Sequence, residues 1–281
     1  MVQATGRALA AARQSSVEQL FAFVTSAIRD AANRHQVLDR LERETGIRPQ
    51  FLSGQDEARL TYLAVRSRYG WSAGRLLVVD IGGGSMEIML GRDAEPELAV
   101  SLPLGAGLLT REFLPDDPPT GEQISALRKH IRDTLREVVD RIRWEGEPAR
   151  AIGTSKTFKQ LARLAGAPPQ RKGPFVRRAL SAKDFGDWVP RLAAKCAAKR
   201  SKLRGVSRAR ARQVLAGALV VKATMKALNT TSVEICPWAL REGIMLHYLQ
   251  TKLDHIRELP LQPVRPGEIG GSPREEPSRS S

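Results

Sequence analysis

The first seventy residues alternate short apolar runs with stretches in which apolar residues recur at helical spacing. Residues 20–25 (LFAFVT) and 48–53 (RPQFLS) are typical of short buried strands. They separate three stretches of helical periodicity, at residues 4–16, 26–46 and 54–70. The alternation of helix and strand predicts an α/β fold in which helices cross between neighbouring strands.

A stiff apolar run followed at once by three glycines stands out at residues 77–90, LVVDIGGGSMEIML. Its first part has the β-branched, apolar character of a strand buried on both faces. After the glycines, Met86, Ile88 and Leu90 alternate with their neighbours, so the pattern predicts a strand, a tight turn and a second strand. Residues 96–105 (PELAVSLPLG) predict a continuation of the same sheet.

The second half of the chain is predicted to be mainly helical. Residues 122–144 carry an apolar stripe typical of an amphipathic helix. Residues 149–166 indicate a strand, a loop and a helix, and residues 206–229 indicate a further helix. A strand at 232–237 and a last helix at 239–254 complete the pattern.

Charge narrows the range of partners. The 281 residues include 45 lysines and arginines against 30 aspartates and glutamates, a net charge of +15. Polyanions are the natural partners of so basic a protein, which leaves nucleic acid, an acidic membrane surface or a phosphate-rich small substrate. The strongest basic cluster, residues 195–212, has no interleaved aromatic residues to stack on bases, and a helix pair with a solvated basic face explains it about as well.

Other features of the composition predict a cytoplasmic protein. No apolar run approaches the ~18 residues of a transmembrane helix, and the start of the chain lacks the apolar block of a secretory signal. Cys196 and Cys236 have no CxxC or histidine neighbour, so we expect reduced thiols rather than a disulfide or a zinc site. The four histidines lie in separate helical segments without ligand spacing.

The glycine turn has two interpretations. Glycines allow positive φ and let successive N–H groups converge on an anion, and Asp80 before them is placed to hold a divalent cation beside bound phosphate. The alternative is an ordinary hairpin with a glycine-rich turn. No Walker loop is present, and Glu87 occupies the place of the third glycine that a dinucleotide-binding fingerprint requires.

Two polar residues near other helix starts also have alternative roles. Ser53 and Asp56 form a capping box, and Glu57 is rotated about 100° from Asp56, free to face the sheet edge. A glutamate in a first helical turn more often compensates the helix dipole than acts in catalysis. Arg29, also near a helix start, should either meet an anion or point into water.

A third candidate anion site lies in GTSKTF, residues 153–158. Thr154 and Ser155 fall between a predicted strand and a helix N-terminus, although an ordinary N-cap accounts for them as well. No residue has the surroundings of a covalent nucleophile. Three anion-facing elements and two isolated acids in a basic protein therefore indicate phosphoryl chemistry with water as the nucleophile.

Several motifs, in order along the chain, resemble those of the exopolyphosphatase and guanosine pentaphosphate phosphohydrolase family, in particular its actinobacterial branch. The resemblance covers about residues 17–250 and implies an actin-like, sugar-kinase-like fold of two ribonuclease-H-type domains with the active site between them. The motifs are FVTSAIRDAAN, FLSGQDEARLTYLAV, VVDIGGGSMEI, SLPLGAGLLTREFL, GTSKTFKQLARL, QVLAGALV and CPWALREGIML.

The resemblance implies catalytic roles for three residues. Glu57 matches the general base that activates the attacking water, and Arg29 matches an arginine that engages phosphate. Asp80 matches the acid that supports a divalent cation, Mg²⁺ or Mn²⁺. The implied substrates are polyphosphate or guanosine pentaphosphate, with neither a specific nucleic acid nor a membrane as partner, and a homodimer is plausible.

The resemblance also implies a phosphate-binding set. Glu87 matches the acid that trails the glycine loop. Thr154 and Ser155 match a third, less specific loop, although Lys156 stands where many members have glycine. The residues that match the phosphate-holding loop itself are Gly82, Gly83, Gly84 and Ser85.

One part of the family pattern has no counterpart in this sequence. Members begin with a strand, an Asp-x-Gly-Ser/Thr-Asn turn and a returning strand, whereas this sequence opens on the helix that would follow them. We expect a first domain truncated at its N-terminus, residues 1–62, a second domain, residues 63–256, and a disordered tail, residues 257–281. Either the natural protein starts upstream, or a short form serves as a non-catalytic binding protein.

Overall fold

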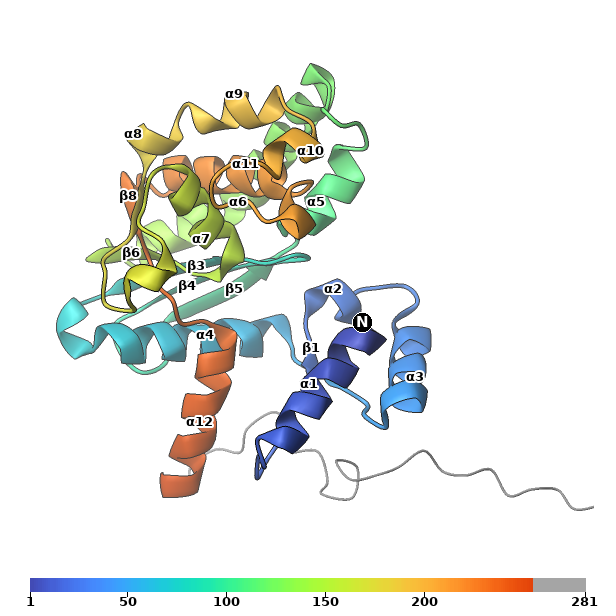
Figure 1. Ribbon diagram of the computed structural model, residues 1–281. Coiled ribbons are helices and arrows are strands. Elements are labelled where there is room, and N and C mark those ends of the chain that lie inside the picture. Colours follow the sequence, from blue (N-terminus) through green and yellow to red (C-terminus); the bar gives the residue numbers. More distant parts are fainter. Residues whose placement is uncertain (255–281) are drawn as a thin grey trace, which may run out of the picture. The chain divides into compact units, whose positions relative to one another are not determined.

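The computed structural model in Figure 1 describes residues 1–254, which fall into two compact units, residues 1–52 and 53–254. The boundary expected between residues 62 and 63 falls inside a helix of the second unit. The expected tail at 257–281 lies outside the described residues. No helix among those described is both long and apolar enough to cross a membrane.

The first unit has a small core. Its two short strands pair in parallel, Phe23 with Gln50 and Val24 with Phe51, and Val24 packs with Leu38 and Leu41. The strand pair confirms the predicted crossover arrangement. The elements of this unit are α1 (Val2–Gln14), β1 (Phe23–Val24), α2 (Ser26–Arg29), α3 (Arg34–Thr45) and β2 (Gln50–Phe51).

The single helix predicted at residues 26–46 is wrong at its centre. The chain forms α2, breaks, and resumes as α3, which ends as predicted at Gly46 with φ of 73°. Arg29 Nη1 donates to the Leu52 carbonyl at 2.6 Å, and Arg34 Nη1 donates to the Arg29 carbonyl at 3.2 Å. These side-chain bonds hold the end of α2 and the start of α3 in positions that a continuous helix would not give.

The second unit is built on a six-stranded mixed sheet in the order β5-β4-β3-β6-β8-β7. Strand β3 is antiparallel to β4 and parallel to β6, so the predicted strand, turn and strand form a hairpin at the centre of the sheet. The strands are β3 (Leu76–Ile81), β4 (Met86–Gly91), β5 (Leu98–Leu102), β6 (Arg150–Gly153), β7 (Ala179–Ser181) and β8 (Ser232–Ile235).

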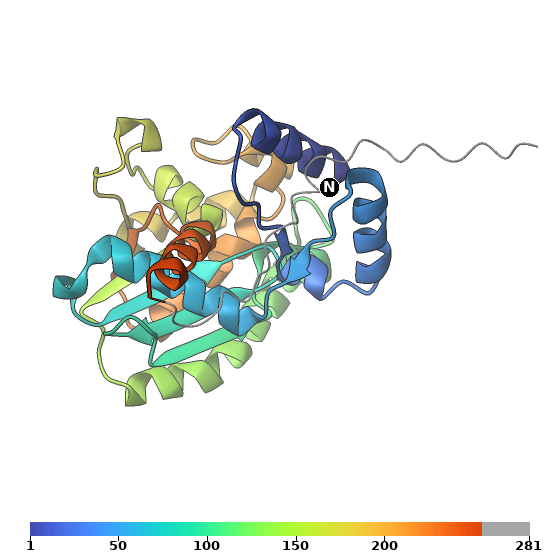
Figure 2. The ribbon, with the colours of Figure 1, turned by 90° about the horizontal axis from the view of Figure 1, so that it is seen from below.

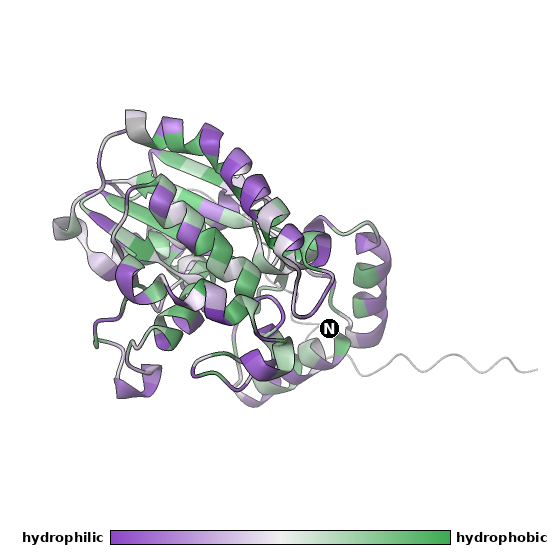
Figure 3. Ribbon diagram, turned by 90° about the horizontal axis from the view of Figure 1, so that it is seen from above, coloured by the Kyte–Doolittle hydropathy of each residue, from purple (hydrophilic) through white to green (hydrophobic). Residues whose placement is uncertain are grey.

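The larger core lies on one face of this sheet, where Leu77, Val79 and Ile81 of β3 meet Met86, Ile88 and Leu90 of β4 under a layer of helices. Figure 1 shows α6, α7 and α11 on this side. In Figure 3 the strands are mostly hydrophobic and hydrophilic residues mark the outer helices. The helices of this layer are α5 (Ala106–Phe113), α6 (Gly121–Trp144), α7 (Ser155–Leu164), α9 (Trp188–Ala193) and α11 (Val214–Ala227).

One helix covers the opposite face, and a second helix packs against that helix. Helix α4 (Gly54–Tyr69) packs Ala58 and Tyr62 against Val78 and Met89, and α12 (Leu240–Asp254) lies beside it in Figures 1 and 2. The two helices touch closely at Gly243, where an added Cβ would lie 1.9 Å from the Leu60 carbonyl oxygen. The predicted capping box starts α4: the Asp56 N–H donates to Ser53 Oγ at 3.0 Å.

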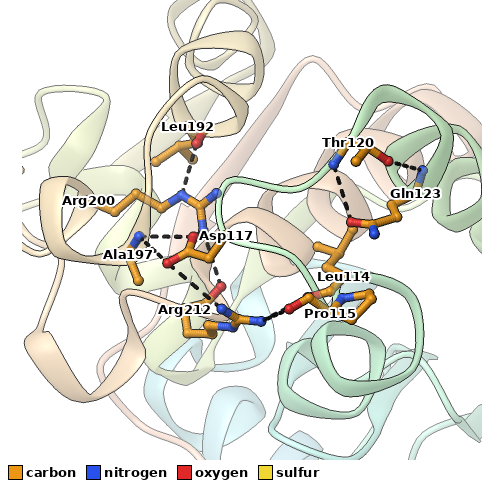
Figure 4. Close-up of polar contacts among 9 residues, drawn as sticks. All are labelled: Leu114, Pro115, Asp117, Thr120, Gln123, Leu192, Ala197, Arg200 and Arg212. Carbon is orange, nitrogen blue, oxygen red and sulfur yellow. Dashed lines mark hydrogen bonds and ion pairs between the residues drawn. The ribbon is translucent and has the colours of Figure 1, made fainter.

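Part of the basic cluster 195–212 is buried and has a structural role. Arg200 is 2% exposed and donates from Nε to the Leu192 carbonyl at 2.9 Å, and its Nη1 lies 3.6 Å from Asp117 Oδ1. Figure 4 shows Asp117 also accepting from the Ala197 N–H and lying near Arg212. Two members of the cluster therefore fix loops to one another. The short helices here are α8 (Ala182–Phe185) and α10 (Ala197–Arg200).

The helix predicted at residues 206–229 begins later than expected. A 3₁₀ turn at Arg208–Arg210 precedes α11, which starts at Val214. The short edge strand β7 was not predicted. Both cysteines are free, as expected.

Candidate active site

The glycine loop between β3 and β4 is fixed by the start of α5. The Gly82 N–H donates to the Ser85 carbonyl at 2.9 Å, and the Gly82 and Gly83 carbonyls accept from Ala106 and Leu108 at 3.0 and 2.8 Å. In a planar trans peptide the N–H points opposite to the carbonyl of the same unit. The N–H groups of Gly83 and Gly84 are therefore directed away from α5.

On the α5 side this contact needs glycine. A Cβ on Gly105 would lie 2.3 Å from the Gly84 carbonyl carbon, and a Cβ on Gly107 would lie 2.9 Å from the Gly83 carbonyl oxygen. Backbone atoms cannot give way as a flexible side chain can. The glycines of PLGAG thus let the loop rest directly on the helix backbone.

Two acids sit side by side at the end of this hairpin. Asp80 and Glu87 are partners in the antiparallel register, so their side chains share the sheet face that α4 covers. Asp80 is half-buried and Glu87 is buried. Ser101 Oγ, on the next strand, donates to Glu87 Oε1 at 2.9 Å. Predicted as separate features, Asp80 and Glu87 form one acidic pair.

The surroundings of Asp80 disfavour its charge. Burial, and then the negative charge of Glu87, raise the pKa of Asp80 to about 7, while Lys159 and Arg210 act in the opposite direction. Loss of water around a carboxylate and a neighbouring like charge both favour the protonated form. A divalent cation would remove this conflict.

Glu57 occupies the first turn of α4 and is 6% exposed. Further along the helix, Tyr62 reaches Gly91, and Arg66 Nη1 donates to the Gly74 and Arg92 carbonyls at 2.8 Å. Those groups lie at the end of the hairpin opposite to the glycine loop. The start of α4, with Glu57, is therefore directed toward the end of the sheet that carries Asp80.

The start of α7 is bonded to the same strand. The Thr154 N–H donates to the Val79 carbonyl at 3.0 Å, and Thr157 Oγ1 donates to the Ile81 carbonyl at 2.8 Å. Thr154 Oγ1 donates to the Trp238 carbonyl at 2.8 Å, so this hydroxyl does not cap the helix. The predicted second and third loops thus lie next to each other at the carboxyl ends of β3 and β6.

Ser155 has the features of a binding residue. Its φ is 71°, in the left-handed region that L-residues rarely occupy. Its Oγ is buried and makes no hydrogen bond within residues 1–254, although it is near enough to favour the charged form of Asp80. The strained backbone and the buried hydroxyl make Ser155 a candidate ligand-binding residue.

Sequence reasoning missed two cations of this site. Lys159 and Arg210 act electrostatically on Asp80, and burial lowers the pKa of each. Lys159 Nζ donates to the Pro237 carbonyl at 2.8 Å. The position of Lys159 one helical turn after Ser155 was an available signal. Arg210 was hidden in the basic cluster.

Arg29 is placed differently from the other predicted residues. It lies in the first compact unit, where it contacts the Leu52 carbonyl and Asp30, whereas the remaining predicted site residues lie in the second.

The donor set fits Mg²⁺ held partly by substrate. Among residues 1–254 no three His, Cys, Asp or Glu side chains gather closely enough to hold a metal by themselves. Asp80 and Glu87 offer carboxylate oxygens beside the anion-receptive loop. Mg²⁺ in phosphoryl-transfer sites is commonly held by one or two carboxylates together with substrate phosphates.

An α/β sheet of this topology, with two loops next to each other at the carboxyl ends of neighbouring parallel strands, places the protein in the actin-like, sugar-kinase-like class. Residues 2–252 match the model of the Ppx/GppA phosphatase family, and the chain belongs to this family. It is therefore an enzyme of the phosphoanhydride hydrolase type.

Curated relatives and solved structures of similar proteins support the same family assignment. Exopolyphosphatase 1 of Mycobacterium tuberculosis is 49% identical over 261 residues, covering 92% of this chain and 76% of the relative, and the Mycobacterium leprae protein of the same name is 48% identical over 254 residues, covering 90% and 75%. The crystal structure of an exopolyphosphatase from Cytophaga hutchinsonii aligns with a TM-score of 0.75 at 25% identity, over 89% of this chain and 79% of that one. An Aquifex aeolicus Ppx/GppA family member aligns at 0.70 and 27%, over 92% and 81%. The predicted family and fold class are confirmed.

Proposed function

We propose that this protein is an exopolyphosphatase that releases orthophosphate from the end of inorganic polyphosphate. The observation that carries the proposal is the junction of the glycine loop, the acidic pair Asp80 and Glu87, and the strained Ser155 at one end of β3. Further support comes from the mycobacterial relatives, which are named exopolyphosphatases. Guanosine pentaphosphate, which the same chemistry would accept, is a second substrate.

In this proposal the terminal phosphoryl group is held by the N–H groups of Gly83 and Gly84 and by Ser155 Oγ. Asp80, with Glu87 beside it, would hold Mg²⁺, which neutralises phosphate charge when bound. Lys159 and Arg210 add positive charge on the same side. These groups orient the terminal phosphorus and stabilise the charge that spreads over its oxygens.

Glu57 acts as the general base. It takes a proton from water as the water oxygen bonds to the terminal phosphorus, and the bond from that phosphorus to the bridging oxygen breaks. The products are orthophosphate and a chain shorter by one phosphate. We infer from the family motif alone that Arg29 engages phosphate.

The test is Glu57→Gln, which keeps the shape of the side chain and removes its basicity. We expect orthophosphate release from polyphosphate with Mg²⁺ to fall by about 10² to 10⁴-fold, the usual contribution of a general base. Glu137→Gln, exposed on α6, is the matched control and should leave the rate unchanged. Full activity in Glu57→Gln would reject the assigned base. Saturable binding of polyphosphate without product by the unaltered protein would instead support a binding protein.

A further inference from the structure

A pocket of about 270 Å³ lies where the end of α4 meets β8 and the loop that leads into β7. Its walls come from Arg68 and Tyr69 of α4, from residues 174–178 of the loop, and from β8 with the residues after it. The volume is close to the ~300 Å³ at which small-molecule pockets begin. None of the residues assigned to the candidate active site lines this pocket.

An exposed aromatic ring forms one wall of the pocket. Phe175 is 83% exposed, and the Arg68 guanidinium lies 4.8 Å from the centre of its ring. A single exposed apolar side chain is ordinary on a protein surface, but this one lines a cavity and is already paired with a cation. The Phe175 ring therefore offers a flat apolar surface on which a planar aromatic ligand can stack.

Arg68 brings positive charge to the same pocket. Its Nη2 donates to the Pro174 carbonyl at 2.9 Å, and its guanidinium lies 5.8 Å from the centre of the Trp238 ring. No carboxylate oxygen of residues 1–254 lies within 4.0 Å of this guanidinium. A carbonyl and two rings thus hold the cation in place, and its other donors suit the oxygens of a phosphate group.

One acid lines the pocket as well. Glu234 Oε1 lies 2.9 Å from Arg177 Nη2 and 3.4 Å from Arg150 Nη1. Glu234 Oε2 accepts no hydrogen bond within the part of the chain that the structure describes, so it can accept one from an N–H group of a ligand. A carboxylate among apolar residues disfavours a chain of bare phosphates, because like charges repel. The chemistry of the pocket therefore differs from that of the glycine loop.

We propose that this cavity, the Phe175 pocket, binds a nucleoside phosphate, with the base stacked on Phe175 and the phosphate at Arg68. An aromatic ring, a cation with no neighbouring acid and a carboxylate oxygen free to accept are the groups that recognise a base, a phosphate and an N–H donor on the base. A bare phosphate would use only Arg68, and a neutral aromatic ligand would use only Phe175. A free nucleotide and a nucleotide within single-stranded RNA both carry all the groups required.

The experiment measures binding to the whole protein in EDTA, so that no Mg²⁺ draws phosphate to the candidate active site. The probes are adenosine monophosphate, guanosine monophosphate and a single-stranded RNA of about 12 nucleotides. Phe175→Ala removes the ring, and Phe175→Tyr keeps it. Trp144→Ala removes another exposed aromatic side chain, on α6, and is the matched control. We expect Kd to rise about 5- to 150-fold in Phe175→Ala, the usual effect of losing one base–aromatic stack, and to stay within about twofold in the other two variants.

The outcomes separate the two sources of the ligand. Binding of the monophosphates identifies a free nucleotide, and binding of the RNA alone identifies a nucleotide within a strand. Failure of all three probes to bind at ~1 mM, or equal Kd values in Phe175→Ala and Trp144→Ala, would overturn the Phe175 pocket. Displacement of the bound probe by an equal concentration of tripolyphosphate would overturn it too, since the pocket would then respond only to negative charge.

The Phe175 pocket and the proposed function can fail separately. The binding measurements need no hydrolysis, so they remain decisive if the protein releases no orthophosphate. Orthophosphate release from polyphosphate should be the same in Phe175→Ala as in the unaltered protein, because Phe175 lies outside the candidate active site. A loss of release in Phe175→Ala as large as in Glu57→Gln would contradict the separation of the two sites.

Discussion

The carboxyl group of Asp80 shows how the site stores unfavourable interactions that a ligand can relieve. It is withdrawn from water next to Glu87, and its pKa is raised to about 7. In the unfolded chain an aspartate titrates near ~3.9. The folded state therefore binds more protons than the unfolded state between these values, and the free energy of unfolding decreases as pH rises through that window.

Asp80→Asn should remove this penalty. Without Mg²⁺, we expect the variant to be more stable than the unaltered protein at pH 8, by on the order of 1 to 3 kcal/mol, because one pKa unit is worth 1.36 kcal/mol. Near pH 3.5, where the aspartate is largely protonated in both states, the difference should nearly vanish. Urea denaturation at the two pH values measures the free energy of unfolding of both proteins. Equal stability at pH 8 would contradict the claim that burial and Glu87 disfavour the charged form of Asp80.

At the level of elements, the contact between the glycine loop and α5 carries a separate prediction. Gly105→Ala places a Cβ 2.3 Å from the Gly84 carbonyl carbon, so the loop must move. We expect the free energy of unfolding to fall by about 1 to 3 kcal/mol, as for other overpacked sites. We also expect the rate of phosphate release by the folded protein to fall, because the displaced loop belongs to the candidate site. Gly121→Ala at the start of α6, where an added Cβ meets nothing within 4 Å, is the control. Equal activity of the two variants would show that the loop does not depend on this packing.

The elements that could be predicted from sequence are those fixed by local pattern. The hairpin at residues 77–90 follows from its apolar run and its glycines, and the start of α4 follows from Ser53 and Asp56. No periodicity indicates the break between α2 and α3, where Arg29 bonds to Leu52, a residue far away in sequence.

The candidate site was predictable to a similar degree. Motif residues such as Asp80 and Ser155 could be named because their neighbours along the chain define a turn or a helix start. Lys159 had a signal in its position one helical turn after Ser155, but Arg210 could not be named, because many cations in this sequence have similar local patterns. Lys159 faces Asp80 because of the way α7 is rotated about its axis, and Arg210 faces Asp80 because of the 3₁₀ turn before α11.

For the whole molecule, the two compact units differ in the size of their cores. The first has a buried cluster of Val24, Leu38 and Leu41 and a pair of two-residue strands, while the second has a six-stranded sheet with helices on both faces. A two-stranded sheet alone is marginally stable. Unequal protection of backbone amides should follow.

Hydrogen exchange measures this directly. We expect amides of residues 23–24 and 50–51 to exchange at least about tenfold faster than those of β3, β4 and β6, since local opening of a small core requires less free energy. The buried central strands should exchange only through large-scale unfolding. Equal protection of the two units would show that they unfold as one cooperative body.

The bond from Thr154 to Val79 has a consequence for how substrate preference can evolve. Backbone bonds between β3 and β6 set the separation of the glycine loop and Ser155, independently of most side chains. Substitutions that preserve the strands therefore leave the spacing of the two loops unchanged. Selection for other phosphorylated substrates would have to act on peripheral side chains, and the chemistry at the terminal phosphate would be inherited intact.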